Sequence, residues 1–128
     1  MNPFLVYWLP WYAYLALIFF LSSIPRPDQA LGFEIKDFFA HPLEYFFLPL
    51  LTFRAFRQSR YGTLKNRFLV RGVLFCLFYA ATDEFHQLFV PHRSGCLVDV
   101  LYDSIGIGLG TVLYHFFGAG GSSGDLSA

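Results

Sequence analysis

The chain has 128 residues, of which 55% are hydrophobic, 21% aromatic and only 14% charged. A soluble domain usually carries about 25% charged residues, so this composition favours a protein that is solvated by lipid. The length allows a single domain. The formal net charge is zero and no basic patch is interleaved with aromatic residues, so nucleic acid is not an expected partner. Two cysteines, Cys76 and Cys96, are too few for a disulfide framework and are interpreted as free packing thiols.

Four apolar stretches follow one another, and a membrane-spanning helix needs about 20 such residues. They cover residues 4–21 and, approximately, 38–56, 68–88 and 97–117. The first stretch has no basic residue before it, so we interpret it as a retained helix and not as a cleaved signal peptide. The sequence therefore predicts an all-α domain, 1–117, built as an antiparallel bundle of four transmembrane helices. Residues 118–128 are rich in Gly and Ser and are predicted to form a disordered tail.

The basic residues predict the orientation of this bundle in the membrane. Six of the nine lie around the second loop, and cytoplasmic loops carry an excess of Lys and Arg. The six are Arg54, Arg57, Arg60, Lys65, Arg67 and Arg71. The second loop and both termini are therefore predicted to be cytoplasmic, and the first and third loops are predicted to face outward.

Ionisable residues gather at the outward ends of the predicted helices. Such residues are costly inside a membrane and by default mark a functional site or a water-filled cavity. They are His41, Glu44, Asp83, Glu84, His86, Arg93, Asp99 and Asp103. Four segments of the chain are thus expected to bring polar groups to one level of the bundle.

Helical spacing predicts which of these side chains face the same way. In the third helix, Asp83, His86 and Gln87 are three and four residues apart and should share a face. Glu84 should point roughly 100° away from them. In the second helix, His41 and Tyr45 are four residues apart. The fourth helix carries one stripe of Asp99, Asp103, Gly106 and Gly110.

Each group has a chemical and a structural interpretation. Asp83, Glu84 and His86 are either an acid/base or metal-binding group or a solvated helix end. Arg93 is either a clamp for a phosphate or carboxylate or a partner for Asp99, Glu84 or lipid head groups. Asp99 and Asp103 either share a proton for general acid catalysis or make structural hydrogen bonds. His41 and Tyr45 either form a hydrogen-bonded core pair or take part in catalysis.

Several of these segments resemble a known family. The stretch 83–93, followed by Asp99 and then Gly106 and Gly110, resembles the signature of the VanZ family. The sequence Asp37-Phe38-Phe39-Ala40-His41, with Tyr45 one turn later, resembles its second-helix motif, and Ser22-Ser23-Ile24-Pro25 is similar to its first-helix exit. The resemblance covers nearly the whole chain. Three positions depart from the family pattern: His92 replaces a usual glycine, Asp103 a usual asparagine and Phe38 a common lysine.

The family is named for a membrane protein associated with resistance to the glycopeptide teicoplanin. The resemblance implies a multi-pass protein of the bacterial inner (plasma) membrane. We hypothesise that its outward cavity binds the polar part of an envelope lipid or lipid-linked precursor. Asp83, Glu84, His86 and Asp99 are the predicted catalytic residues, and the predicted substrate-binding residues are Arg93, Gln87, His41, Tyr45 and Asp103. Asp99 is expected to orient His86 or Arg93.

Other interpretations remain open at this point. Whether the chain is an enzyme is undecided, and a divalent metal ion is a candidate cofactor. The alternative function is a non-catalytic module for lipid- or ion-coupled transport or for docking of another membrane protein. A third interpretation gives the charges a purely structural role. The Gly106-x-x-x-Gly110 pair allows close helix packing, either within the bundle or in a homo-oligomer.

Overall fold

The computed structural model describes residues 1–25, 37–93, 95 and 97–118. These residues form four long helices, with no strand among them. The elements are η1 (Phe4–Trp8), α1 (Leu9–Ser22), α3 (Asp37–Arg57), the short α4 (Gly62–Lys65), α5 (Phe68–Gln87), α6 (Leu97–Leu113) and η2 (Tyr114–Gly118). The all-α prediction is confirmed. The loop 26–36, Cys96 and the predicted tail beyond Gly118 lie outside the described residues.

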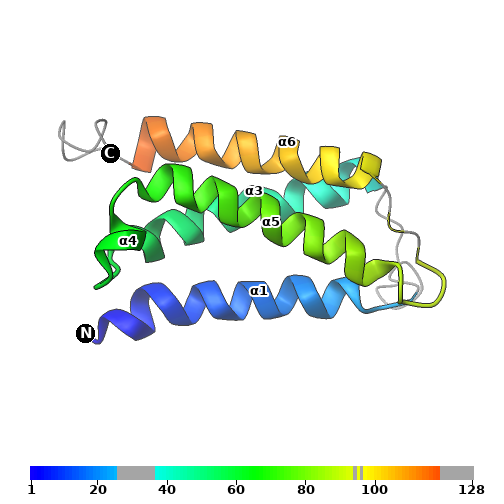
Figure 1. The fold of residues 1–128 in the computed structure, drawn as a ribbon, viewed down its shortest axis with the longest axis horizontal. Coiled ribbons are helices and arrows are strands. Elements are labelled where there is room, and N and C mark those ends of the chain that lie inside the picture. Colours follow the sequence, from blue (N-terminus) through cyan, green and yellow to red (C-terminus); the bar gives the residue numbers. More distant parts are fainter. Residues whose placement is uncertain (26–36, 94, 96, 119–128) are drawn as a thin grey trace.

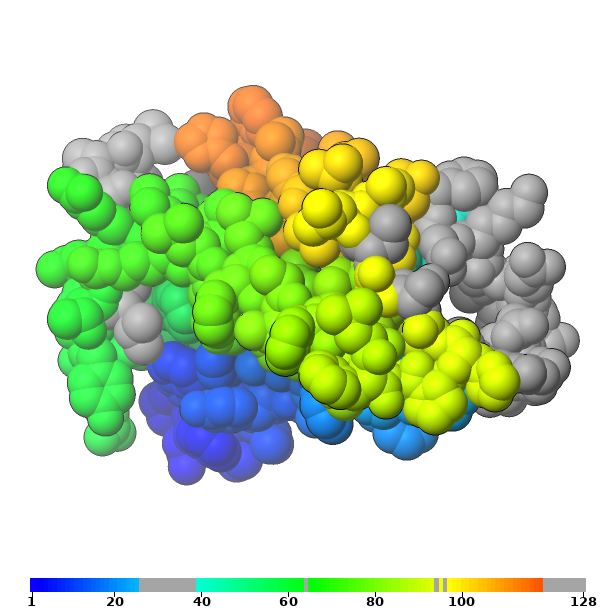
Figure 2. All heavy atoms as spheres, turned by 45° about the vertical axis from the view of Figure 1, so that its right-hand side comes forward, coloured from blue at the N-terminus to red at the C-terminus, as the bar shows by residue number. Residues whose placement is uncertain are grey.

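The four long helices lie side by side, and consecutive helices run in opposite directions (Figure 1). The first and the last described residues lie on the same side of the bundle as α4 (Figure 1). α6 packs most extensively against α3, and these two helices run parallel. α1 packs against α3 and α5. Figure 2 shows α5 in the middle of one face, between α1 and α6.

Two glycines of α6 explain its close approach to α3. A Cβ atom added at Gly106 would overlap the backbone carbonyl of Pro42, and one added at Gly110 would overlap that of Phe46. The ring of Pro49 also reaches the position of a Cβ on Gly110. Small residues allow helix backbones to approach in this way. The glycine pair therefore serves packing within the bundle, and its face is occupied by α3.

The core near α4 is aromatic. Trp11, Phe53, Phe56, Phe68 and Tyr114 form one buried cluster. The indole nitrogen of Trp11 donates a hydrogen bond to the Thr52 hydroxyl over 3.0 Å. A buried indole N–H needs such an acceptor, so this bond fixes the height of α1 against α3.

Apolar side chains cover the outside of all four long helices. Two helical stretches, Phe4–Ser22 and Leu97–Gly118, are long and apolar enough to cross a membrane. α3 and α5 have 21 and 20 residues but carry more charges. The exposed apolar residues include Phe19 and Phe20 on α1, Phe39, Leu43 and Phe47 on α3, Val70, Leu74, Phe78 and Phe85 on α5, and Leu101, Ile105 and Leu109 on α6. The helix count agrees with the predicted bundle, and two of its helices are confirmed as candidate spans.

Candidate functional site

The polar side chains gather at the end of the bundle opposite α4. The start of α3, the end of α5 and the start of α6 meet there (Figure 1). Asp103 and Tyr45 are fully buried, and four other predicted site residues are at least nine-tenths buried. Those four are His41, Asp83, Glu84 and Gln87. The structure thus brings together acidic and imidazole groups from three helices in a place shielded from solvent.

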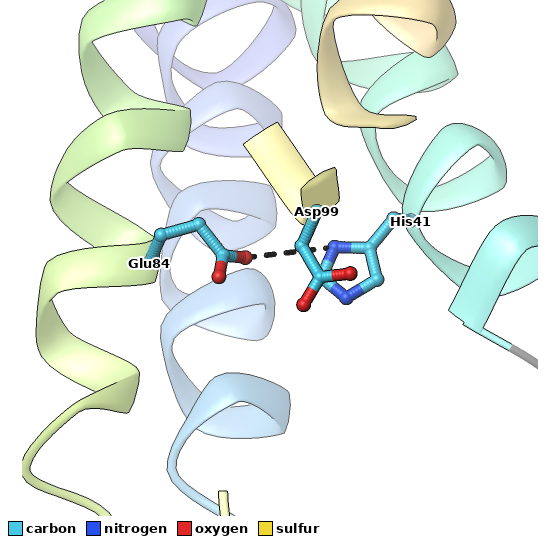
Figure 3. A group of neighbouring side chains, drawn as sticks. All are labelled: His41, Glu84 and Asp99. Carbon is cyan, nitrogen blue, oxygen red and sulfur yellow. Dashed lines mark ion pairs between the residues drawn. The ribbon is translucent and has the colours of Figure 1, made fainter. Parts of the chain in front are cut away.

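His41 lies at the centre of this group. Its Nδ1 atom is 2.8 Å from Oδ1 of Asp103 and 3.7 Å from Oε1 of Glu84. Asp99 lies beside the imidazole ring (Figure 3). One ligand atom from each of His41, Glu84 and Asp99 lies within 4.8 Å of the other two. We call these three residues together with Asp103 the His41 cluster. It joins α3, α5 and α6.

A second contact joins α3 to α5 one turn further along α3. The Tyr45 hydroxyl donates a hydrogen bond to Oδ2 of Asp83 over 2.9 Å, and both side chains are buried. His41 and Tyr45 therefore form separate hydrogen bonds to different helices. His41 bonds Asp103 on α6, and Tyr45 bonds Asp83 on α5.

His86 contacts a different neighbouring helix from Asp83 and Glu84. Its Nε2 atom is 3.0 Å from the Ser23 hydroxyl, and its ring stacks on Phe19 at a centroid distance of 4.6 Å. It therefore faces α1, whereas Glu84 belongs to the His41 cluster. Asp83 and His86 are three residues apart on α5, yet they contact different helices, because α5 packs against α1, α3 and α6. The buried face of α5 is wide enough to include both Asp83 and Glu84, and the neighbouring part of its surface packs against α1.

The hydrogen bonds around Ser23 determine which nitrogen of His86 carries a proton. The Ser23 hydroxyl has one hydrogen, which it donates to the Phe19 carbonyl over 2.7 Å. With this bond made, the hydroxyl accepts from His86, and we therefore expect Nε2 to carry the proton. The role of Ser23 was not predicted, although Ser22-Ser23-Ile24-Pro25 was noted as a motif.

We expect the Nε2–H proton of His86 to be visible in the NMR spectrum of the ¹⁵N-histidine-labelled protein in micelles. The bond to Ser23 should slow its exchange with water. Ser23→Ala removes the acceptor and should broaden or abolish this signal. His115 is exposed at the far end of α6 and serves as an internal reference in the same spectrum. A signal that is unchanged in Ser23→Ala would show that this hydrogen bond does not form.

The chain was compared with known families, curated proteins and solved structures. A family model described as VanZ/LLP1 matches residues 4–118. The chain belongs to the VanZ/LLP1 family. No curated protein and no solved structure matches it. The VanZ resemblance inferred from the signature residues is confirmed over nearly the whole chain, and the family is linked to glycopeptide resistance.

Two departures from the usual VanZ pattern now have a structural setting. His92 has φ of 62°, a left-handed conformation that glycine adopts most easily. This explains why glycine suits the position in the family. Asp103 replaces a usual asparagine and is the fully buried partner of His41. Asp103 therefore adds a buried acid to the polar cluster of this VanZ chain.

Arg93 lies in the turn after α5, at the same end of the bundle as the His41 cluster. Its side chain is half-buried, and its backbone N–H donates to the Val90 carbonyl over 3.2 Å. It lies within electrostatic range of Glu44, which is near Asp83 and Asp103. Its positive charge is thus placed close to the acidic site.

Proposed function

We propose that this VanZ chain binds the polar head of an envelope lipid or lipid-linked precursor and so protects cells against teicoplanin-type glycopeptides. One observation carries the proposal: ionisable side chains from α3, α5 and α6 converge at one end of an otherwise apolar bundle. Buried ionisable groups in a membrane protein are by default functional. The link of the family to glycopeptide resistance supplies the phenotype.

The proposed orientation puts this polar end at the outer face of the bacterial inner membrane, with both termini in the cytoplasm. The basic residues of the α3–α5 connection lie at the opposite end, which the positive-inside rule assigns to the cytoplasm. Four membrane spans are supported by exposed apolar side chains on every long helix, because soluble proteins rarely expose such continuous surfaces. A head group at the outer leaflet would then lie level with the His41 cluster.

The residues divide the recognition of a head group between them. Arg93 would pair with its phosphate or carboxylate. The carboxylates of the His41 cluster accept hydrogen bonds, so they suit hydroxyl or ammonium groups of the same head. Tyr45 holds Asp83, and Ser23 holds His86, so these side chains are fixed before a ligand arrives. Such preorganisation lowers the cost of binding.

The test is drug susceptibility in a glycopeptide-sensitive Gram-positive host. Wild type, Glu84→Gln, Arg93→Gln and the double variant Asp83→Asn/His86→Ala are compared at matched membrane abundance. His115→Ala is the control, since His115 lies outside the polar site. We expect wild type and His115→Ala to raise teicoplanin resistance more than vancomycin resistance, and the site variants to lose this effect.

The outcomes separate the parts of the proposal. Absence of protection by wild type would remove the resistance phenotype. Protection that persists in all site variants would show that the polar end is not the functional site. Direct binding of anionic lipid vesicles by the purified chain, lost in Arg93→Gln alone, would assign the anionic contact to Arg93.

A further inference from the structure

The His41 cluster has the ligand types and spacing of a metal site. It offers one imidazole nitrogen and two carboxylates from three different helices, His41 on α3, Glu84 on α5 and Asp99 on α6 (Figure 3). Ligand atoms that bind one ion at about 2.0–2.2 Å lie about 3.4 Å apart in a tetrahedral site and at most about 4.4 Å apart. The 3.7 Å between His41 Nδ1 and Glu84 Oε1 is close to the tetrahedral value. The three ligand atoms of His41, Glu84 and Asp99 all lie within 4.8 Å of one another. Their side chains therefore need to move inward only slightly to bind one ion.

A second observation points independently to a bound cation. Asp103 is 0% exposed, and its Oδ2 atom is buried without a hydrogen-bond partner among the described residues. Its other oxygen is 2.8 Å from His41 Nδ1, so the unpartnered oxygen belongs to the same cluster. An unsatisfied buried carboxylate oxygen costs free energy. A cation beside it would remove this cost.

The charge balance of the polar end also favours a cation. Five carboxylates lie close enough to influence one another or His41, and among the described residues the basic groups that act on them are His41 and Arg93. The five are Glu44, Asp83, Glu84, Asp99 and Asp103. Several carboxylates cannot all be ionised in a water-poor site without a compensating charge. A divalent ion supplies two positive charges at the point where the carboxylates meet.

We propose that His41 through Nδ1, Glu84 and Asp99 bind a divalent transition-metal ion, with Asp103 as the fourth ligand. One imidazole with several carboxylates suits Zn²⁺ or Mn²⁺, whereas Mg²⁺ and Ca²⁺ prefer oxygen ligands alone. The ion takes the place of the proton between His41 and Asp103. Metal ligation requires a deprotonated imidazole nitrogen, so binding should release a proton and weaken at low pH.

The experiment uses the full chain, purified in detergent micelles and stripped with a chelator. Zn²⁺, Mn²⁺ or Mg²⁺ is added, the excess is removed, and bound metal is measured by mass spectrometry. The thermal unfolding midpoint is recorded in parallel. Glu84→Gln and Asp99→Asn keep the side-chain shape, and His41→Ala is matched by His115→Ala, which removes a histidine outside the cluster.

We expect wild type and His115→Ala to retain a single Zn²⁺ or Mn²⁺ ion per chain and to unfold at a higher temperature with metal. Glu84→Gln, Asp99→Asn and His41→Ala should bind at least about 10–100-fold more weakly. Failure of wild type to retain either ion overturns the proposal, as does equal retention by Glu84→Gln and Asp99→Asn. If His41→Ala does not fold, these two variants decide. The result is independent of the proposed lipid ligand, because neither lipid nor antibiotic enters the assay.

Discussion

Gly106→Leu is expected to prevent assembly of the helix bundle, whereas Gly108→Leu should leave it intact. A side chain at Gly106 would meet the backbone of Pro42, which cannot rotate aside, so α6 would have to move away from α3. Gly108 is exposed and has nothing within 4 Å of an added Cβ. Overpacking usually costs about 1–3 kcal/mol, and a backbone clash belongs at or above the upper end of this range. Leucine at Gly108 should even favour the helix, by about 0.5–1 kcal/mol.

The two variants differ by position alone, so they form a matched pair. Membrane abundance and the unfolding midpoint of the purified chain in micelles are the measurements. Because Asp103 lies one turn before Gly106, any separation of α6 from α3 should also break its bond to His41. Equal midpoints for Gly106→Leu and Gly108→Leu would contradict the close contact between α3 and α6.

Removing both partners of the His41–Asp103 bond should cost clearly less than the sum of the two single removals. His41→Leu leaves a fully buried carboxylate without its donor, which typically costs about 3–5 kcal/mol. Asp103→Leu leaves the His41 ring without its nearest acceptor. With both residues changed to leucine, neither polar group remains to be left unpaired, so the double variant should recover roughly 1–3 kcal/mol of the summed loss.

The measurement is a double-mutant cycle on the unfolding free energy in mixed micelles, with the chelated protein so that no metal contributes. Ser104→Ala provides the control, since the Ser104 hydroxyl bonds the Val100 carbonyl within its own helix. Combined with His41→Leu, its effect should simply add. Additive effects of His41→Leu and Asp103→Leu would mean that the bond between them contributes no coupling energy.

The sequence predicted the four long helices well because each is a mainly apolar stretch of sufficient length, with its charged residues placed near the ends. The predicted first and fourth stretches, 4–21 and 97–117, differ from the candidate spans Phe4–Ser22 and Leu97–Gly118 by one residue each. The gathering of polar residues at one end could be predicted because consecutive helices alternate in direction. This prediction does not require knowing which helices are in contact.

The individual pairings could not be predicted in this way. His41 and Asp103 are 62 residues apart, and Ser23 and His86 are 63 apart. Their contact depends on the order and rotation of the helices around the bundle axis. Spacing on one helix gives relative directions only, so it does not show which neighbouring helix Glu84 or His86 faces. The packing of α5 against α3 places Glu84 near His41, and the contact between α5 and α1 places His86 near Ser23.

The glycine contacts make α3 and α6 behave mechanically as one body. Gly106 lies on Pro42 and Gly110 on Phe46, so the two backbones are engaged four residues apart on both helices and cannot slide without a clash. If the proposed head group enters the bundle, we therefore expect α1 or α5 to be displaced. At the polar end the bond between Ser23 and His86 connects these two helices. This bond holds α1 against α5, so Ser23→Ala should let the two helices separate more often at the polar end of the bundle.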